Sequence, residues 1–157
     1  MTSNYHEGKL EDADIFSAVR AAGGTTAAIA HSFFSDYFQA SPFDPMRDME
    51  VGDIHRPIQH ARFYTMAGAN KAQPATPSDI DLFWQMSLLI ERHQPDYFLF
   101  HSCTLDSLGH NYGFDSIQID KNCYTIDSAL GDFIPRCQAP ESNLITPAHH
   151  SPCSNIN

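Results

Sequence analysis

Five bulky side chains follow one another without polar alternation at Tyr97-Phe98-Leu99-Phe100-His101. A half-exposed strand would alternate apolar and polar residues, so this run predicts a strand buried on both faces, as in a parallel sheet. A second short run, 25–30, predicts another buried strand, which ends beside His31. A helical pattern that Asp12 or Asp14 can cap precedes this second run. The order of helix, turn and buried strand is typical of an α/β crossover.

Helical patterns account for much of the remaining chain. Apolar residues recur at helical spacing over about 14–22, 33–38, 78–93 and 116–134. Ser78 is expected to cap the clearest of these helices, whose apolar face includes Phe83, Trp84 and Met86 as core residues. Pro135 is expected to end the last helix, because proline cannot continue the hydrogen-bond ladder.

The alternation of helices and short buried strands predicts a three-layer α/β sandwich with a mainly parallel sheet. A last strand is expected at 143–146. Ligands of such sheets bind at the carboxyl ends of the strands. The segments after Ala30, His101 and Thr146 are therefore the places where we expect a site.

The chain has 157 residues, which favours one domain. Periodicity is lost over 41–77, a stretch with five prolines, an acidic patch and one short apolar piece at 61–64. We interpret 41–77 as an irregular insert, and a loop of this length is typical of segments that line a site. The polar residues 151–157 are expected to be a frayed tail.

The charge balance excludes several classes of partner. Asp and Glu number 19 against 9 Lys and Arg, a formal net charge of −10, so the chain is a poor ligand for nucleic acid or for an anionic membrane. No apolar run is long enough to span a bilayer, and residues 1–7 do not resemble a signal peptide. A cytoplasmic protein with reduced thiols is expected, because the cysteines are widely spaced and form no CxxC motif: Cys103, Cys123, Cys137 and Cys153.

The candidate metal-binding residues lie in the segment that follows the bulky run at 97–101. Asp106 and His110 are four residues apart, a spacing that places both side chains on one face of a helical turn. A carboxylate and an imidazole so placed can share one zinc or similar divalent ion. Gly109 and Gly113 are interpreted as allowing the backbone to bend around that ion. A capped turn with a surface histidine would show the same spacing, and this alternative stays open.

Residues 106–113 resemble the D-x-x-G-H-x-x-G motif of the type I phosphodiesterase and nucleotide pyrophosphatase family, in the alkaline phosphatase superfamily. The resemblance extends to 95–102 before the motif, to Asp127 and Leu130-Gly131 after it, and to 15–31. It implies an alkaline-phosphatase-like fold and a two-metal hydrolase of phosphodiester, pyrophosphate or phosphomonoester bonds. It further implies small phosphorylated substrates such as nucleotides, zinc as the metal, and Asp106 and His110 as ligands of one of the two ions.

The chain departs from the family pattern in the other half of that site. Thr25 and Thr26 begin a strand rather than a helix and do not replace the family nucleophile, so no catalytic residue is assigned and the substrate-binding residues are unknown. His149 falls where a late metal-binding histidine belongs, but Ala148 stands in place of the aspartate before it. His149 is therefore a third candidate ligand, or with His150 a chance pair in the tail.

These departures lead to three hypotheses. The first is a single partial phosphodiesterase-like domain over 1–157, a truncated hydrolase that is weak or inactive and holds at most one ion. The second is a non-catalytic metal- or partner-binding fragment of the same incomplete fold, which could self-associate through exposed apolar surface. The third is an unrelated small α/β binding protein in which Asp106 and His110 are incidental.

Overall fold

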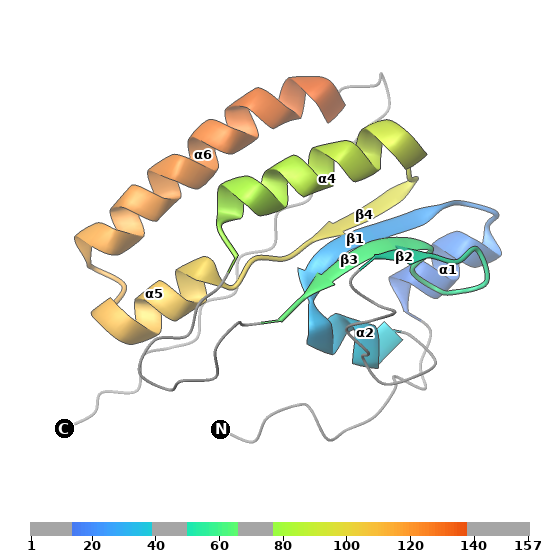
Figure 1. The fold of residues 1–157 in the computed structure, drawn as a ribbon, viewed down its shortest axis with the longest axis horizontal. Coiled ribbons are helices and arrows are strands. Elements are labelled where there is room, and N and C mark those ends of the chain that lie inside the picture. Colours follow the sequence, from blue (N-terminus) through green and yellow to red (C-terminus); the bar gives the residue numbers. More distant parts are fainter. Residues whose placement is uncertain (1–13, 39–49, 66–76, 138–157) are drawn as a thin grey trace.

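The computed structural model describes residues 14–38, 50–65 and 77–137 (Figure 1). These ranges contain five helices and four strands. The elements in chain order are α1 (Ile15–Ala21), β1 (Thr26–His31), α2 (Ser32–Phe38), β2 (Val51–Gly52), β3 (His60–Tyr64), α4 (Asp79–His93), β4 (Tyr97–Phe100), α5 (Thr104–Tyr112) and α6 (Ile117–Cys137).

The four strands form one sheet in the order β2-β3-β1-β4. β1 pairs in parallel with both β3 and β4, and Ala28 lies opposite Ala61 on one side and Leu99 on the other. The short β2 adds an antiparallel strand to β3. All six residues of β1 are buried, because strands cover both of its edges and helices cover both of its faces. The prediction of a mainly parallel sheet is confirmed.

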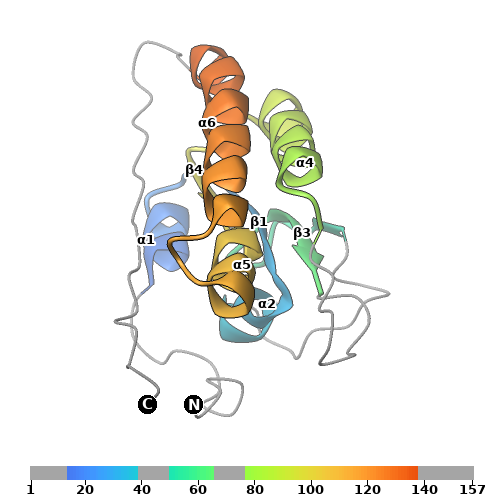
Figure 2. The ribbon, with the colours of Figure 1, turned by 90° about the vertical axis from the view of Figure 1, so that its left-hand side faces the viewer.

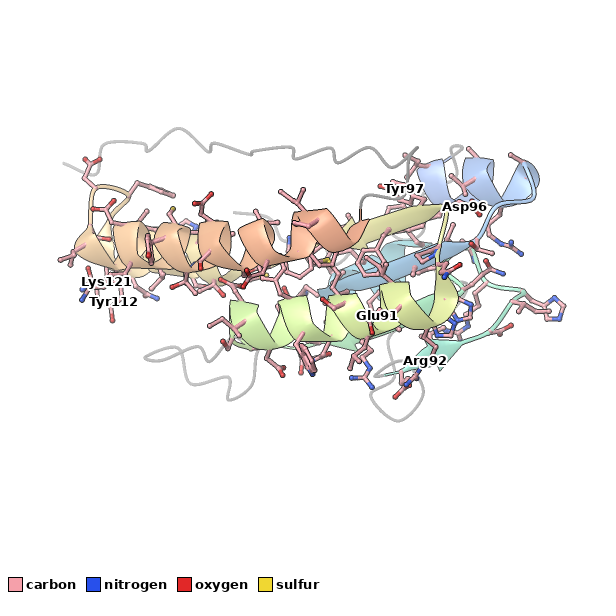
Figure 3. The ribbon with its side chains drawn as sticks, turned by 90° about the horizontal axis from the view of Figure 1, so that it is seen from above. Glu91, Arg92, Asp96, Tyr97, Tyr112 and Lys121 are labelled. Carbon is pink, nitrogen blue, oxygen red and sulfur yellow. The ribbon has the colours of Figure 1, made fainter. Side chains whose placement is uncertain are left out.

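Two apolar clusters, one on each face of the sheet, make the predicted three layers. Ala28, Ala30 and Phe63 pack with Phe16 of α1, and Phe34 of α2 lies against the same cluster. The opposite face contributes Ile29, Tyr64 and Phe98 to a cluster with α4 and α6, whose members include Leu82, Met86 and Phe133. Figure 3 shows α4 and α6 side by side, with Glu91 and Arg92 toward one end of the layer and Tyr112 and Lys121 toward the other.

The stretch 41–77 is not irregular throughout, which corrects the sequence interpretation. Its apolar piece lies in β3, and this strand occupies an interior position of the sheet between β2 and β1. Ala61 and Phe63 are buried on one face, whereas Arg62 points away and pairs with Glu50 across 3.1 Å. The short polar-apolar alternation becomes a stable strand only because β1 supplies the missing hydrogen-bond partners.

β4 is less buried than its composition predicts. All four of its residues are only partly buried, although each is large and apolar or aromatic. The reason is its position: within the described residues β4 lies at the edge of the sheet and pairs with β1 alone. The continuous bulky run therefore indicated a strand correctly but indicated its burial on both faces wrongly.

The helix ends agree with the sequence patterns only in part. Asp14 caps α1 as expected, since its carboxylate accepts the backbone N–H of Ser17 at 2.8 Å. Ser78 stands at the start of α4 but makes no capping hydrogen bond with its side chain. Pro135 lies inside the last turn of α6 and does not end it.

Trp84 is exposed, in contrast to the prediction that it belongs to the core. Its exposed fraction is 59%, as is that of Ile80. α4 turns Leu82, Phe83 and Met86 toward the sheet, so the stripe that Ile80 and Trp84 share lies on the solvent side. The described part of the chain contains no helix that is both long and apolar enough to cross a membrane.

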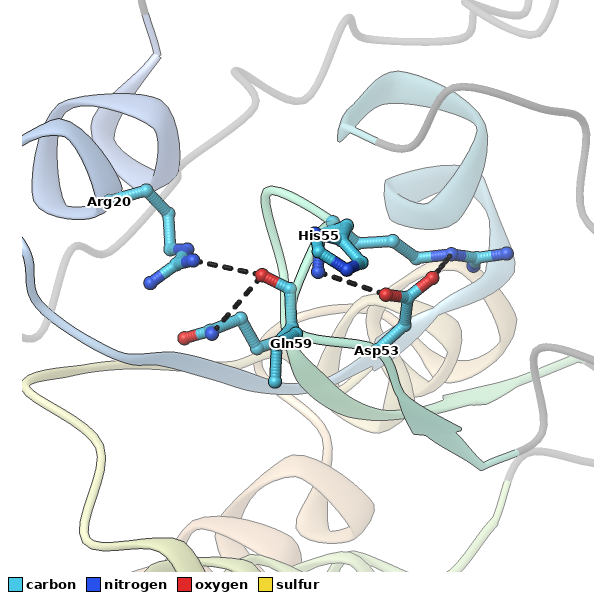
Figure 4. A network of polar contacts seen from close by, with 6 residues as sticks. Arg20, Asp53, His55 and Gln59 are labelled. Atoms are coloured by element: carbon cyan, nitrogen blue, oxygen red, sulfur yellow. Dashed lines mark hydrogen bonds and ion pairs between the residues drawn. The ribbon is translucent and has the colours of Figure 1, made fainter.

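A network of polar contacts joins α1 to the turn before β3 at the amino ends of the strands (Figure 4). The Arg20 guanidinium donates to the carbonyl of Ile54 at 2.9 Å and to that of Gly24 at 2.7 Å. Asp53 accepts the backbone N–H of His55 at 2.9 Å and pairs with Arg56 at 3.6 Å. These polar groups thus stabilise the fold at the amino ends of the strands, which is the end of the sheet opposite α5.

Two stacked histidines join β3 to the end of α4. The rings of His60 and His93 lie 3.7 Å apart between centroids and are inclined by only 7°. Partial burial, and then the proximity of His93, lower the pKa of His60 below its ordinary value. Two protonated rings in this stack would repel each other, so the stack favours neutral imidazole.

We expect the protein to lose stability as the pH falls below the ordinary pKa of histidine, about 6.5. The unfolded chain binds a proton at His60 near its ordinary pKa of about 6.5, whereas the folded chain binds it only at lower pH. The contribution of neutral His60 to the free energy of unfolding is therefore fully present above its unfolded pKa. This contribution declines as the pH falls toward the pKa of His60 in the folded chain. Thermal melts at several pH values would measure this. His60→Gln should reduce the pH dependence and leave the part that His101 contributes, because burial also lowers the pKa of His101. An equally steep dependence in His60→Gln would contradict the role of the stack.

Candidate functional site

The carboxyl ends of β3, β1 and β4 meet at one edge of the sheet, as the parallel arrangement requires. Tyr64 ends β3, His31 ends β1 and His101 follows β4. The rings of His31 and Tyr64 lie 5.7 Å apart in an edge-to-face contact. Phe34 of α2 lies 4.8 Å from the ring of His101. The edge at which the sequence predicted a site is therefore lined by aromatic and imidazole rings.

Tyr64 holds the segment that leaves β4. Its side chain is 7% exposed, and its hydroxyl donates to the carbonyl of His101 at 2.9 Å. The same hydroxyl lies 3.6 Å from the Sγ of Cys103. Burial is the largest of the effects that raise the pKa of Tyr64 far above its ordinary value, so the hydroxyl stays protonated and remains a donor. Tyr64 thus links β3 to the start of the candidate site.

Cys103 and His101 do not form an activated nucleophile pair. The Sγ of Cys103 lies 3.9 Å from the Nδ1 of His101. Burial raises the pKa of the Cys103 thiol, although the contact with Tyr64 opposes this. Burial and the nearby His31 lower the pKa of His101, against a smaller effect of Asp106. A protonated thiol beside a neutral imidazole lacks the thiolate that nucleophilic catalysis needs.

Asp106 and His110 both belong to α5, the helix that begins directly after this edge of the sheet. Figure 2 shows α5 below the lower end of α6. The Nε2 of His110 is 3.4 Å from the Oδ1 of Asp106. Both side chains are largely exposed, at 53% for His110 and 71% for Asp106. The prediction that the four-residue spacing places them on one helical face beside a strand end is confirmed; their role as metal ligands stays a prediction.

The two motif glycines have structural roles that differ from the predicted bend around an ion. Gly109 is buried inside α5, where a Cβ atom would lie 2.4 Å from the Cε1 of Phe114. Gly113 has a φ of 84° and stands at the end of α5, a backbone conformation that glycine adopts at little cost. Glycine at these positions thus lets the chain turn back and pack Phe114 on the helix.

The side chains of Asp106 and His110 can be compared with the number and type of ligands that a zinc ion needs. Carboxylate and imidazole are common zinc ligands, and the two side chains are close enough to approach one ion. Catalytic zinc sites usually have three protein ligands. Within residues 14–38, 50–65 and 77–137, no three His, Cys, Asp or Glu side chains are grouped so that they could hold an ion. Asp106 and His110 therefore fit as two ligands only, and His149 lies outside the described residues.

Asp79 is the residue that sequence reasoning missed. It lies in the first turn of α4, and its side chain is only 4% exposed. Its carboxylate accepts the hydroxyl of Thr104 at 2.9 Å, the amide of Asn122 at 2.9 Å and the hydroxyl of Ser102. These donors are 23 to 43 residues away along the chain, so no local pattern could indicate them.

The comparisons with known proteins give one match. The family model described as type I phosphodiesterase / nucleotide pyrophosphatase matches residues 11–150. A search among curated proteins and a search among solved structures each give no match. The family match covers most of the chain, including α5 and the strands that position it.

Proposed function

The chain belongs to the type I phosphodiesterase and nucleotide pyrophosphatase family, and from this premise we propose that Asp106 and His110 bind one divalent metal ion for phosphoester chemistry. The family consists of phosphodiesterase- and pyrophosphatase-type hydrolases that act on small phosphorylated substrates such as nucleotides and are generally metal-dependent. A bound divalent ion would neutralise charge on phosphoryl oxygens. The proposed metal is zinc, and His149 is proposed as a third ligand.

The observation that carries this proposal is the placement of the pair. Asp106 and His110 are one helical turn apart, 3.4 Å from each other, exposed to solvent and adjacent to the carboxyl ends of three parallel strands. A surface ion pair unrelated to metal could have the same distance. The place of Asp106 and His110 at the sheet edge where α/β proteins bind ligands favours a ligand-binding role over an unrelated surface pair.

We expect zinc binding to depend on this pair. Asp106→Asn and His110→Gln should each weaken zinc binding by at least about tenfold, since even groups that only support metal ligands contribute about 10- to 100-fold. Isothermal titration of the whole chain with zinc measures the change. Asp120→Asn in the first turn of α6 and His55→Gln at the other end of the sheet are matched controls. Unchanged affinity in the double variant at 106 and 110 would contradict the site.

Hydrolysis separates the proposed enzyme from the alternative, a non-catalytic metal-binding protein of the same fold. The alternative is favoured by one observation: among the described residues, no third His, Cys, Asp or Glu side chain joins Asp106 and His110 in a group that could hold an ion. The chain would be incubated with zinc or manganese and p-nitrophenyl thymidine phosphate. Turnover that Asp106→Asn abolishes supports the enzyme, and zinc binding without turnover supports the alternative.

Self-association is the remaining part of the proposal. Large apolar side chains are exposed on two of the helices that cover one face of the sheet, including Trp84 at 59% on α4 and Tyr124 at 77% on α6. Where exposed apolar side chains form a contiguous patch, that patch is typical of surfaces that contact another protein. The exposure of these side chains supports the proposed association of the chain with itself or with a partner.

A further inference from the structure

We propose that Asp79 is a positioning residue: its buried carboxylate fixes the start of α5 and thereby the direction in which Asp106 and His110 face. The inference rests on the proposed function, because it concerns the same pair of side chains. Asp79 itself lies on α4 and makes no hydrogen bond to Asp106 or His110 that the structure records. It acts through the segment that connects β4 to α5.

The connection between β4 and α5 is held by hydrogen bonds that converge on one atom. The Oδ1 of Asp79 accepts the hydroxyls of both Ser102 and Thr104. The backbone N–H of Thr104 in turn donates to the Oγ of Ser102 at 3.2 Å. Thr104 is the first residue of α5, and Cys103 before it makes no capping hydrogen bond with its side chain. The beginning of α5 is therefore anchored to α4 rather than capped by its own N-cap residue.

The second carboxylate oxygen ties the same residue to α6. The Oδ2 of Asp79 accepts the side-chain amide of Asn122 at 2.9 Å. α5 is followed directly by α6, so Asp79 contacts both helices of this pair. One carboxylate at the start of α4 thus contacts the loop after β4, the first residue of α5 and the second turn of α6.

A carboxylate suits this position better than other side chains. All three donors that contact it are neutral hydroxyl or amide groups, and a carboxylate can accept from all of them while presenting no hydrogen of its own. The first turn of α4 adds backbone N–H groups and the positive end of the helix dipole. Burial of an acidic group at 4% exposure needs such compensation.

The geometric consequence reaches the candidate ligands within one turn. Asp106 is two residues after Thr104, and His110 is one turn further along the same helix. A rotation or fraying of the first turn of α5 changes the position of Asp106 relative to His110. Asp79 therefore matters for the pair even though it touches neither residue.

The test compares contacts to α5 with the contact to α6. Thr104→Val removes the hydroxyl that Asp79 accepts and keeps the side-chain shape, and Asp79→Ala removes the whole anchor. Asn122→Ala removes only the α6 contact and is the matched control. Asp79→Asn keeps one acceptor oxygen for Ser102 and Thr104 and places its NH2 group toward Asn122, whose side-chain amide can turn its oxygen to accept, so it serves as the conservative rescue. All are measured at a temperature at which circular dichroism shows the folded state.

Two readouts are taken on each variant. Zinc affinity by isothermal titration should fall by about tenfold or more in Thr104→Val and Asp79→Ala, as expected for groups that orient metal ligands, and much less in Asn122→Ala and Asp79→Asn. Amide hydrogen exchange in Thr104→Val should accelerate over residues 104–112 while α4 and α6 keep their protection, because this substitution removes only the contact between Asp79 and α5. A merely structural role would instead lower protection in α4, α5 and α6 together.

The outcomes separate this inference from the proposed function. Unchanged zinc affinity and unchanged exchange over 104–112 in Thr104→Val would overturn the positioning role, as would a uniform loss of protection. Absence of zinc binding by the unsubstituted chain would overturn the proposed function instead. The exchange measurement would then still decide whether Asp79 holds α5.

Discussion

Replacing Phe63 with alanine is expected to lower the free energy of unfolding by about 3–5 kcal/mol, the cost typical of deleting a buried phenylalanine ring. Phe63 lies in β3, is 1% exposed and packs with Phe16, Ala28 and Ala61 between the sheet and the helix layer of α1 and α2. The substitution removes the ring and leaves a cavity among side chains that the sheet holds in place. Urea denaturation followed by circular dichroism measures the change.

Trp84→Ala is the matched control for Phe63. Its side chain is also aromatic, but it is 59% exposed on the outer side of α4. Its removal should change the free energy of unfolding by less than about 1 kcal/mol, in the range of surface substitutions. A loss at Trp84 as large as that at Phe63 would contradict the arrangement of α4, and a loss below about 1 kcal/mol at Phe63 would contradict the interior position of β3.

Replacing Thr26 with valine is expected to cost about 1–3 kcal/mol, because it leaves buried polar groups without a partner. Thr26 is fully buried at the start of β1. Its hydroxyl donates to the carbonyl of Pro57 at 2.6 Å and accepts the backbone N–H of Gln59 at 3.2 Å. Valine has nearly the same shape, so the measured loss reports these hydrogen bonds rather than packing.

Thr26→Ser tests the same hydrogen bonds with a variant that keeps the hydroxyl. Serine keeps the hydroxyl and loses one methyl group, so it should retain more stability than valine at this position. The reverse order would show that packing and not hydrogen bonding dominates at Thr26. The hydroxyl of Thr26 is thus engaged in hydrogen bonds at the amino end of β1, the end of the strand opposite α5.

Local signals sufficed where the relevant residues are neighbours in sequence. The four-residue spacing of Asp106 and His110 placed both on one face of α5, because helical geometry alone brings such residues together. The same holds for Asp14, whose carboxylate caps α1 three residues before Ser17. The family motif at 106–113 is also a local pattern, and the family match over residues 11–150 confirms the family that it indicated.

Local signals failed where burial depends on which elements are neighbours in space. Trp84 and Phe83 are adjacent on one helix, but only the position of the sheet decides that Phe83 is buried and Trp84 exposed. β4 has the composition of a doubly covered strand, yet it lies at the edge of the described sheet. β3 lies in a polar stretch of the sequence, so its residue pattern did not predict a strand. The strand forms because β1 lies beside it.

The sequence by itself determined the α/β class, the family and the paired placement of Asp106 and His110, since each follows from periodicity or from a short motif. Only the tertiary structure decided that Asp79 is a buried anchor for α5, because its three hydrogen-bond donors come from residues 23 to 43 positions away. The physical reason is the distance along the chain over which each effect acts. Helical spacing relates residues within one or two turns, whereas the burial of a carboxylate depends on every element that packs against it.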